Sequence, residues 1–381
     1  MNIVVNAMPL LTLKTGIGRY MRNLYQDMEA GGDLQIRFFS GFRASPSIPP
    51  EGRPESSIRV IDTLWKLPDP LMFAARSLHF VAYEAMLRKT CGKGGVHLYH
   101  ETGFVPARIP GVPVVYNIYD LSLVRYREKH PRERVWFFDH FLGRRPGDVA
   151  HILTISEFVK SEIIDELRIN PDRVTAVPLA PDPVFYTRCR ESIDSTLNKN
   201  GWPREYLLFV GSLEPRKNLS LFMEALAVTK EKIPVILTGW FAWGDKKWME
   251  NIKGLGLKGR IHFAGYVDDE TLARLYSGAT AFVYPSLYEG FGLPVLEAMA
   301  CGTPVICSNS SSLPETAGEA ALLIDPGDVE GLASCIDRMV GDSRLRLEMR
   351  EKGLLRAACF TWEKTARETF TLFESIVRND G

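Results

Sequence analysis

The chain has 381 residues and is 45% hydrophobic, which is enough for two domains of ordinary size, each with a buried core. Its 46 basic and 46 acidic residues cancel, and this neutrality argues against nucleic acid as a partner. The six cysteines include no Cys-x-x-Cys pair and none beside a histidine at ligand spacing. This pattern excludes the common zinc motifs and favours free thiols in a reducing compartment.

The first expected element is a short buried strand at residues 3–5, near an N-terminus that lacks the charged start of a signal peptide. No run in the sequence approaches the ~18 apolar residues of a membrane-spanning helix. We therefore expect a cytoplasmic protein, either free or held at the inner face of the plasma membrane.

Alternating strand and helix patterns predict a first domain over residues 1–180. A glycine-containing loop, residues 14–20, follows the first strand and leads into a helix that ends near Ala30. Ser156 is predicted to cap a helix whose first turn contains Glu157. The other elements expected here are strands at 35–39, 114–118, 152–155 and 174–177, a loop rich in Pro, Ser, Gly and Arg at 41–58, and a helix at 71–89.

Three prolines between Pro178 and Pro183, with the segment 187–203, mark a domain boundary, and the alternation restarts over residues 181–361. A last helix, 361–377, is predicted to pack back on the first domain, which then includes residues 362–381. The elements expected in the second domain are strands at 206–210, 235–238, 261–263, 281–284, 305–307 and 321–324, and a helix from Asn218 to about Lys230.

This alternation predicts an α/β fold of two Rossmann-like domains, each with a doubly wound parallel sheet and helices on both faces. Ligands of such sheets bind beyond the carboxyl ends of the strands. With two such domains, the central cleft between them is the expected site.

The stretch from Tyr284 to Ile306 is the most informative part of the chain. It has the pattern of a strand, a glycine-broken loop, a helix and a second strand, with Glu289 in the loop and Glu297 about two turns into the helix. Glycines before a helix let backbone N–H groups face an oxygen-rich ligand, and a carboxylate accepts hydrogen bonds from hydroxyls. Because eight residues are ~2.2 helical turns, we expect both acids near one helix face. The pattern indicates a sugar or nucleotide-sugar site.

Two motifs together resemble those of glycosyltransferases with the GT-B fold. They are Gly211-Ser212-Leu213-Glu214-Pro215-Arg216-Lys217-Asn218 and the Glu-x7-Glu pattern in its Gly-Phe-Gly-Leu-Pro setting. More narrowly, they resemble the retaining, nucleotide-sugar-using family 4, the glycosyl transferase group 1 family. The resemblance covers most of residues 205–365 and is weaker in the first half. There, Thr-Gly-Ile-Gly-Arg-Tyr at 15–20 is similar to bacterial mannosyltransferases of surface-polysaccharide assembly.

The resemblance implies roles for both acids. Glu289 hydrogen-bonds the donor sugar near its anomeric centre, together with the backbone amides of Phe291, Gly292 and Leu293. Glu297 holds the ribose hydroxyls. Taken alone, Glu289 could be a solvated loop carboxylate, and Glu297 could be an acid favoured by the helix dipole.

The resemblance also implies a cationic clamp. Arg216 and Lys217 neutralise the diphosphate leaving group, although an exposed basic pair is the alternative. Many relatives carry arginine where this chain has Ser212, so Lys217 is preferred over Arg216. Tyr266 and Val267 follow Gly265 at a strand end. The resemblance implies that the backbone of Tyr266 meets the edge of the nucleobase and that Val267 packs on the base. Ordinary packing in the core is the alternative explanation for Val267.

In the first half, Gly16 and Gly18 form the expected glycine loop, which lets the backbone approach a phosphate or an attacking hydroxyl; a tight turn is the alternative.

Many relatives carry His-Asp where this chain has Tyr119 and Asp120. Tyr119 either replaces the histidine as a polar guide or signals a different acceptor subsite. Asp120 either positions a substrate or caps the next turn. His100, just past an expected strand, either lines the acceptor cleft or is structural.

No Asp-x-Asp occurs, which fits a transferase without a metal or other cofactor. The helical stretch 64–89 has aromatic, aliphatic and basic residues and is either an amphipathic helix packed on the first sheet or a membrane surface that reaches a lipid-linked acceptor.

The sequence thus predicts a retaining, metal-independent hexosyltransferase. It would move mannose from GDP-mannose to a hydroxyl of a glycan or lipid-linked oligosaccharide in polysaccharide or O-antigen biosynthesis. The second domain would bind the donor and the first the acceptor. UDP-glucose, UDP-N-acetylglucosamine and GDP-fucose remain alternative donors. A nucleotide-sugar epimerase of the same fold and a non-catalytic sugar-binding protein are the alternative functions.

Overall fold

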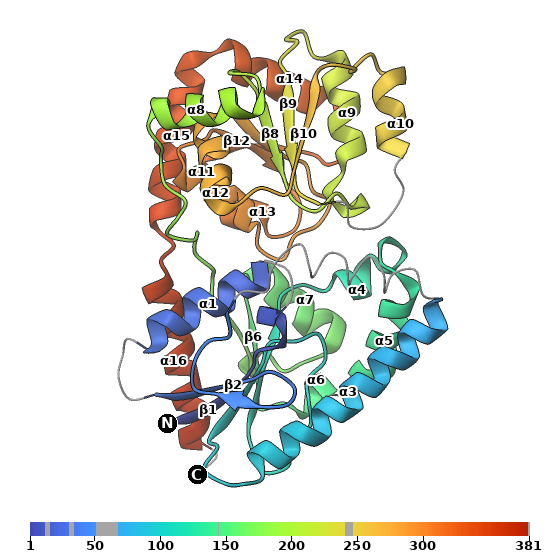
Figure 1. The fold of residues 1–381 in the computed structure, drawn as a ribbon, viewed down its shortest axis with the longest axis vertical. Helices are drawn as coiled ribbons and strands as arrows, with labels where there is room; N and C mark the ends of the chain where they lie inside the picture. The colour runs from blue at the N-terminus through green and yellow to red at the C-terminus, as the bar shows by residue number, and fades with distance from the viewer. Residues whose placement is uncertain (12–15, 30–33, 51–67, 144, 241–246, 380–381) are drawn as a thin grey trace. The chain divides into compact units, whose positions relative to one another are not determined.

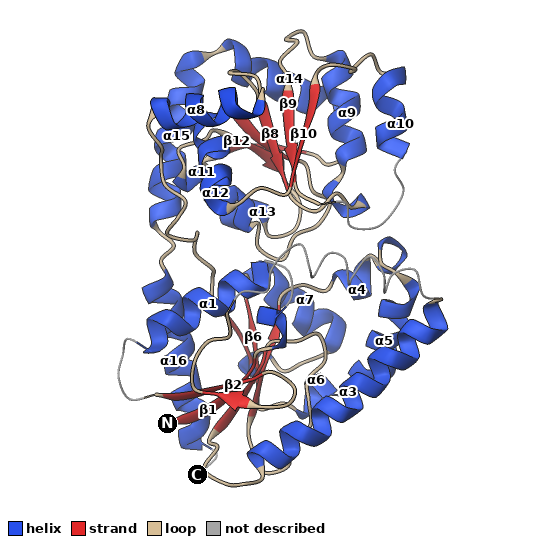
Figure 2. Ribbon diagram, viewed as in Figure 1, coloured by secondary structure: helices blue, strands red, loops and turns tan. Residues whose placement is uncertain are grey.

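A computed structural model describes residues 1–11, 16–29, 34–50, 68–143, 145–240 and 247–379 of the chain. The chain divides into two compact units, Met1–Leu179 with Trp362–Gly381, and Ala180–Thr361. The division falls within the proline-rich segment where the sequence predicts a boundary. Each unit has helices packed around one sheet (Figures 1 and 2).

In the described part of the first unit, seven strands form one sheet in the order β3-β2-β1-β4-β5-β6-β7. Neighbouring strands are parallel except for β3, which is antiparallel to β2. The strands are β1 Asn2–Asn6, β2 Gln35–Phe39, β3 Ala44–Ser45, β4 Leu98–Glu101, β5 Val114–Ile118, β6 His151–Thr154 and β7 Val174–Ala176.

The helices of the first unit follow the predicted alternation. Ser156 caps α7 as predicted, because its side chain accepts a hydrogen bond from the backbone N of Val159 at 3.1 Å. The C-terminal helix α16 packs on α1, and Thr365 Oγ1 donates to the carbonyl of Pro178 at 2.7 Å. The α-helices are α1 Gly16–Glu29, α3 Asp69–Cys91, α4 Ser122–Arg125, α5 Arg132–Leu142, α6 Arg145–Asp148, α7 Glu157–Leu167 and α16 Trp362–Asn379, and the 3-10 helices are η1 Met8–Leu11, η2 Arg127–Lys129 and η3 Pro171–Arg173.

In the second unit, the described residues form a six-stranded parallel sheet in the order β10-β9-β8-β11-β12-β13. Its strands are β8 Leu207–Val210, β9 Val235–Thr238, β10 Ile261–Gly265, β11 Ala281–Tyr284, β12 Val305–Ser308 and β13 Ala321–Ile324. Its helices are α8 Arg190–Asn200, η4 Pro215–Lys217, α9 Leu219–Val228, α10 Lys247–Gly254, α11 Asp269–Gly278, α12 Leu293–Ala300, α13 Leu313–Ala317, α14 Val329–Gly341 and α15 Ser343–Ala358.

Two segments differ from the predicted elements. The expected loop 41–58 contains the short strand β3, while its residues 51–58 lie outside the described part. The expected linker 187–203 contains the helix α8, which buries Ile193 and Leu197 on one side. Two apolar side chains four residues apart are enough to hold a surface helix against the core. In an otherwise polar segment, however, they are only a weak sequence signal for a helix.

The strand order determines where a ligand can bind in each unit. It reverses between β1 and β4 in the first sheet and between β8 and β11 in the second. Loops at the carboxyl ends of the strands diverge at such a point, which leaves room for a ligand. The predicted α/β class with two doubly wound, Rossmann-like sheets is confirmed. Among the described helices, none combines the length and apolar character needed to cross a membrane.

Candidate active site

The loop after β8 carries the predicted cations. It leaves the strand at Gly211, whose φ is +148°, and forms η4, which ends at Lys217. A Cβ added to Gly239 would lie 1.8 Å from the carbonyl oxygen of Gly211, so glycine is required where the ends of β8 and β9 come together. The backbone N of Leu287 donates to the carbonyl of Arg216 at 2.9 Å, which joins this loop to the one after β11.

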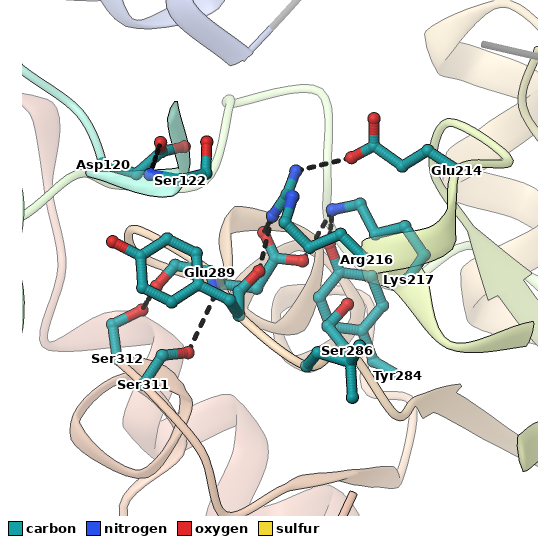
Figure 3. Close-up of polar contacts among 12 residues, drawn as sticks. Asp120, Ser122, Glu214, Arg216, Lys217, Tyr284, Ser286, Glu289, Ser311 and Ser312 are labelled. Carbon is teal, nitrogen blue, oxygen red and sulfur yellow. Dashed lines mark hydrogen bonds and ion pairs between the residues drawn. The ribbon is translucent and has the colours of Figure 1, made fainter. Parts of the chain in front are cut away.

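The loop after β11 carries Glu289, and two serine side chains fix its backbone. Ser311 Oγ accepts from the backbone N of Glu289 at 2.9 Å, and Ser312 Oγ donates to its carbonyl at 2.8 Å (Figure 3). Both backbone groups of a buried loop residue are therefore satisfied. The carboxylate is left free to face the β8 loop.

Five side chains from these two loops and β11 meet, and we call them the Glu289 cluster: Glu214, Arg216, Lys217, Tyr284 and Glu289 (Figure 3). The Nζ atom of Lys217 lies 2.6 Å from one carboxylate oxygen of Glu289 and donates to Tyr284 Oη at 2.7 Å. Arg216 lies 3.3 Å from the other oxygen of Glu289 and 2.6 Å from Glu214. The two predicted cations and the first predicted acid thus come together at the point where the strand order reverses.

The cluster is buried, and this sets its electrostatics. Lys217 is 6% exposed and Glu289 is 7% exposed. Burial by itself raises the pKa of Glu289, but the charges of Lys217 and Arg216 outweigh it and hold the pKa at about 2. Burial lowers the pKa of Lys217 below 10.5, although Glu289 opposes this effect. The carboxylate is therefore ionised and can accept hydrogen bonds from hydroxyls, while two cations beside it can meet phosphate oxygens.

The start of α12 adds backbone donors to the same loop. The helix begins at Leu293 after Gly292, whose φ is +94° and where an added Cβ would lie 2.6 Å from a side-chain atom of Leu313. Among the described residues, the backbone N–H groups of Phe291, Gly292 and Leu293 have no hydrogen-bond partner. Free N–H groups at a helix start attract negative charge. These are the three amides that the resemblance implies as donor-sugar contacts.

The predicted relation of Glu289 to Glu297 is wrong. Because α12 begins at Leu293, Glu289 lies outside the helix, Glu297 lies only one turn inside it, and their spacing is not a helical repeat. Glu297 is 3% exposed and accepts a hydrogen bond from Tyr276 Oη of α11 at 3.2 Å. Its partner thus differs from those of Glu289, and its role toward ribose stays a prediction.

Three other predicted donor-side residues lie near the cluster or at the sheet edge. Ser212 is partly buried, and its carbonyl accepts from the backbone N of Glu214 at 3.0 Å. Tyr266, 39% exposed, and the partly buried Val267 follow β10, the edge strand two positions from β8. Their contacts with a nucleobase stay predictions.

In the first unit, two expected positions need correction. Gly16 and Gly18 are not in a loop, since Gly16 is the first residue of α1 and Gly18 is buried in its first turn. His100 lies within β4 and is fully buried. It contacts Tyr25 Oη and, through Nε2 at 2.6 Å, Asn117 Oδ1, and burial lowers its pKa to about 4. This favours the structural alternative for His100.

The Tyr119-Asp120 pair follows β5. The Tyr119 hydroxyl is buried and, among the described residues, has no hydrogen-bond partner, while its ring packs edge-on against Tyr20 with 5.7 Å between centroids. Burial raises the pKa of Tyr119 well above 10. Asp120 Oδ1 accepts from the backbone N of Ser122 at 2.9 Å, where α4 begins (Figure 3). This contact supports the capping alternative for Asp120.

Four site residues were not predicted from the sequence: Glu214, Tyr284, Ser311 and Ser312. Glu214 and Tyr284 lie within the stretches that carry the motifs, and a run of three serines at 310–312 was the available signal for the other two. None has a side-chain type that marks a site by itself, because each acts through a neighbour.

The pKa of Glu289 predicts a dependence of stability on pH. Its ordinary value is 4.5 and its folded value is about 2, so its stabilising effect is complete above about pH 4.5 and is lost as the pH falls toward 2. In urea unfolding, the stability advantage of the wild type over Glu289→Gln is expected to shrink by roughly 2 kcal/mol between about pH 6 and about pH 3. A difference that is constant over this interval would contradict the ion pairing.

Comparison with known proteins places the chain among characterised sequences. A profile of the family described as glycosyl transferases group 1 matches residues 192–356. The chain is 33% identical to O-antigen chain mannosyltransferase B of Escherichia coli, with 99% of this chain and 100% of that protein covered. It is 26% identical to the MMP alpha-(1->4)-mannosyltransferase of Mycolicibacterium hassiacum, with 95% of each covered. Sucrose-phosphate synthase from Thermosynechococcus elongatus matches the fold with a TM-score of 0.76 at 20% identity, with 100% of both chains covered.

Proposed function

The chain belongs to the glycosyl transferases group 1 family, and from this premise we propose that it is a retaining mannosyltransferase that uses GDP-mannose. Its two doubly wound sheets are those of the GT-B class, and its relatives show that it is a glycosyltransferase. The observation that carries the finer proposal is the Glu289 cluster, in which an ionised carboxylate and two cations meet at the carboxyl ends of β8 and β11.

The Glu289 cluster can bind both the sugar and the diphosphate of a nucleotide sugar. Glu289 has the acceptor oxygens that sugar hydroxyls need, and the free amides at the start of α12 lie in the same loop. Arg216 and Lys217 supply positive charge for the diphosphate that leaves as the glycosidic bond breaks. Glu214 and Glu289 balance the charges of these two cations. The second unit therefore binds the donor, and the first unit binds the acceptor.

The chemistry needs no separate catalytic base. The leaving phosphate takes the proton of the acceptor hydroxyl on the same face from which it departs, so the new bond keeps the configuration of the donor. Lys217 and Arg216 stabilise the phosphate charge through this step, which is the role that a divalent ion plays in metal-dependent transferases. Transfer is expected to proceed in EDTA, and NMR of the product is expected to show the donor's anomeric configuration.

The sugar is assigned from the relatives. The two relatives compared by sequence are both named as mannosyltransferases, and that of Escherichia coli acts on an O-antigen chain according to its name. We therefore assign mannose as the sugar and a glycan or lipid-linked oligosaccharide of polysaccharide assembly as the acceptor. The reaction takes place in the cytoplasm.

Incubation with labelled nucleotide sugars tests the proposal. The expected result is acceptor-dependent release of GDP from GDP-mannose, with UDP-glucose, UDP-N-acetylglucosamine and GDP-fucose at least ten times slower, the lower end of the discrimination that a single small difference between substrates gives. GDP-mannose should also raise the melting temperature more than these three sugars do. An epimerised donor, or no reaction with any donor and acceptor, would contradict the proposal.

A further inference from the structure

The loop that follows β4 carries an exposed aromatic side chain on a buried backbone. We call its residues 102–107 the β4 loop. From Leu98 to Ala107, all of which the structure describes, Phe104 is the only exposed residue, and it is 56% exposed. Val105, the next residue, is 4% exposed. Because burial of a large apolar side chain stabilises a fold, a loop that buries the smaller neighbours and leaves the phenylalanine in solvent keeps its ring available for a ligand.

Buried side chains hold the β4 loop in one conformation. Glu101 is 1% exposed, and its carboxylate accepts from the backbone N of Gly103 at 2.7 Å and from the backbone N of Ala107 at 3.4 Å. Tyr116 Oη donates to the carbonyl of Phe104 at 2.7 Å. A Cβ added at Gly103 would lie 2.9 Å from the Glu101 carboxylate, so the loop fits closely against Glu101 because this residue is glycine. A ligand that contacts the ring of Phe104 thus meets a loop that is already ordered.

The β4 loop lies at the edge of the first sheet where a ligand is expected. The strand order reverses between β1 and β4, and ligands of doubly wound sheets bind beyond the carboxyl ends of the strands at such a point. Thr102 Oγ1 donates to the carbonyl of Asn6, the last residue of β1, at 2.6 Å, and Asn6 Nδ2 donates to Glu101. Phe104 comes three residues after the end of β4. Its ring is therefore presented where the two strands that flank the reversal end.

The chemistry of the β4 loop indicates an uncharged ligand. Residues 102–107 are Thr-Gly-Phe-Val-Pro-Ala and include no charged side chain. Glu101, the carboxylate that precedes the loop, is enclosed by the donors described above and by Tyr99 Oη, which donates to it at 2.9 Å. A pyranose ring is uncharged and has a face of C–H groups, whose small positive charges meet the negative face of an aromatic ring. A phosphate group has no such face.

We propose that a sugar ring of the acceptor stacks on Phe104. The inference rests on the proposed function, because it takes the first unit as the acceptor side of a glycosyltransferase. It adds what that function leaves open: the part of the acceptor that the β4 loop contacts is an uncharged pyranose, which Phe104 selects by its C–H face. Phe104 thereby helps to determine which acceptor is used and does not contribute to binding of the donor.

Acceptor kinetics test the proposal. The probes are methyl α-mannoside and methyl β-N-acetylglucosaminide, two soluble, uncharged sugars without a lipid chain. Phe104→Ala is expected to raise the KM of the acceptor by about tenfold or more, because stacking removes the exposed part of the ring from water. The KM of GDP-mannose, and the rate of its hydrolysis without acceptor, should change by less than about twofold. Since the side chain is exposed, the unfolding midpoint should match that of the wild type.

Two further substitutions at this position separate stacking from ordinary apolar contact. Phe104→Trp keeps a flat aromatic face and should hold the acceptor KM within about threefold of the wild type. Phe104→Leu keeps the apolar character but not the ring face, and should raise the acceptor KM by about fivefold or more. A Phe104→Leu enzyme with the wild-type acceptor KM would overturn the proposal, because a lipid chain needs apolar contact and no flat ring.

Tyr186→Ala is the matched control in the second unit. Tyr186 is 54% exposed, and the guanidinium of Arg188 lies 3.6 Å from its ring centroid. Ser277, near the end of α11, donates to the carbonyl of Tyr186 at 3.5 Å. Because α11 ends shortly before β11 begins, this ring lies near the amino ends of the strands, opposite to the ends that carry the Glu289 cluster. Its loss should leave both KM values within about twofold of the wild type.

Saturation-transfer NMR separates this inference from the proposed function, because it measures contact without a reaction. Irradiation of the aromatic protons of the wild type is expected to saturate the C–H protons on one face of a bound methyl glycoside, and Phe104→Ala should lose most of this signal. A wild type that shows the signal but transfers nothing from GDP-mannose would contradict the proposed donor and support the inference. A wild type without the signal on either glycoside, or a Phe104→Ala enzyme with the wild-type acceptor KM, would refute the stacking.

Discussion

Replacing Glu289 with alanine is expected to lower kcat/KM by roughly a thousandfold or more, the scale seen when a group that acts in the transition state is removed. The physical reason is specific to this chain. Glu289 is ionised and held between Lys217 at 2.6 Å and Arg216 at 3.3 Å. Its loss removes the hydroxyl acceptor and also frees both cations from their fixed positions. The measurement is kcat and KM for donor and acceptor, normalised to the folded fraction.

Stability must be separated from catalysis, because the buried Lys217 and the partly buried Arg216 both lose a partner, and breaking a buried ion pair costs about 3–5 kcal/mol. Glu133→Ala is the matched control, since Glu133 is 4% exposed and pairs with Arg76 at 3.2 Å in the first unit. It should lose comparable stability and keep near-wild-type turnover. Glu289→Gln keeps the side-chain shape and should still lose most activity. A Glu289→Ala enzyme with near-normal turnover would end the assignment.

The core strands were predicted well because burial on both faces produces uninterrupted apolar runs. The bounds of β9 and β11 match the predicted 235–238 and 281–284. Helix α8 was missed because its surface position leaves it only two buried apolar residues. Gly16 and Gly18 were placed in a loop because glycine favours turns, but α1 tolerates both in its first turn.

The site residues could be predicted, but their geometry could not. Lys217 and Glu289 are 72 residues apart, and they meet because β8 and β11 are neighbours in the sheet. That neighbourhood comes from the crossover that reverses the strand order, which no local pattern encodes. The eight-residue spacing of Glu289 and Glu297 gave a wrong prediction for a different reason. It was interpreted as a helical repeat, whereas the loop ends and α12 begins between the two acids.

The supporting residues show a second limit of sequence reasoning. Tyr284 accepts a hydrogen bond from Lys217 Nζ, and Glu214 holds Arg216. Tyrosine at a buried strand end and glutamate before a proline are common features with ordinary packing roles. They belong to the site only because they orient Lys217 and Arg216, and this role can be seen only from interatomic distances in the structure.

Replacing Lys217 with methionine is expected to lower kcat by about a hundredfold to a thousandfold, the usual cost of losing one preorganised charge from a transition state. Methionine keeps much of the volume of the buried side chain and removes the ammonium group. The β-phosphate of the nucleoside diphosphate then loses one of the two cations that we propose to meet it. Glu289 keeps Arg216 as its partner at 3.3 Å, so the pocket loses charge without losing its carboxylate.

Nucleotide binding distinguishes this role of Lys217 from a structural one. The wild type should bind GDP more tightly than GMP, because only GDP carries the β-phosphate, and Lys217→Met should lose most of that preference while its affinity for GMP changes little. Arg260→Met is the matched control. Arg260 directly precedes β10, at the opposite ends of the strands, and donates to the carbonyls of Leu226 and Ile233. It should keep the preference for GDP even if it melts earlier. A Lys217→Met protein that still prefers GDP as strongly as the wild type would place the diphosphate elsewhere and would leave Lys217 only as the structural partner of Glu289.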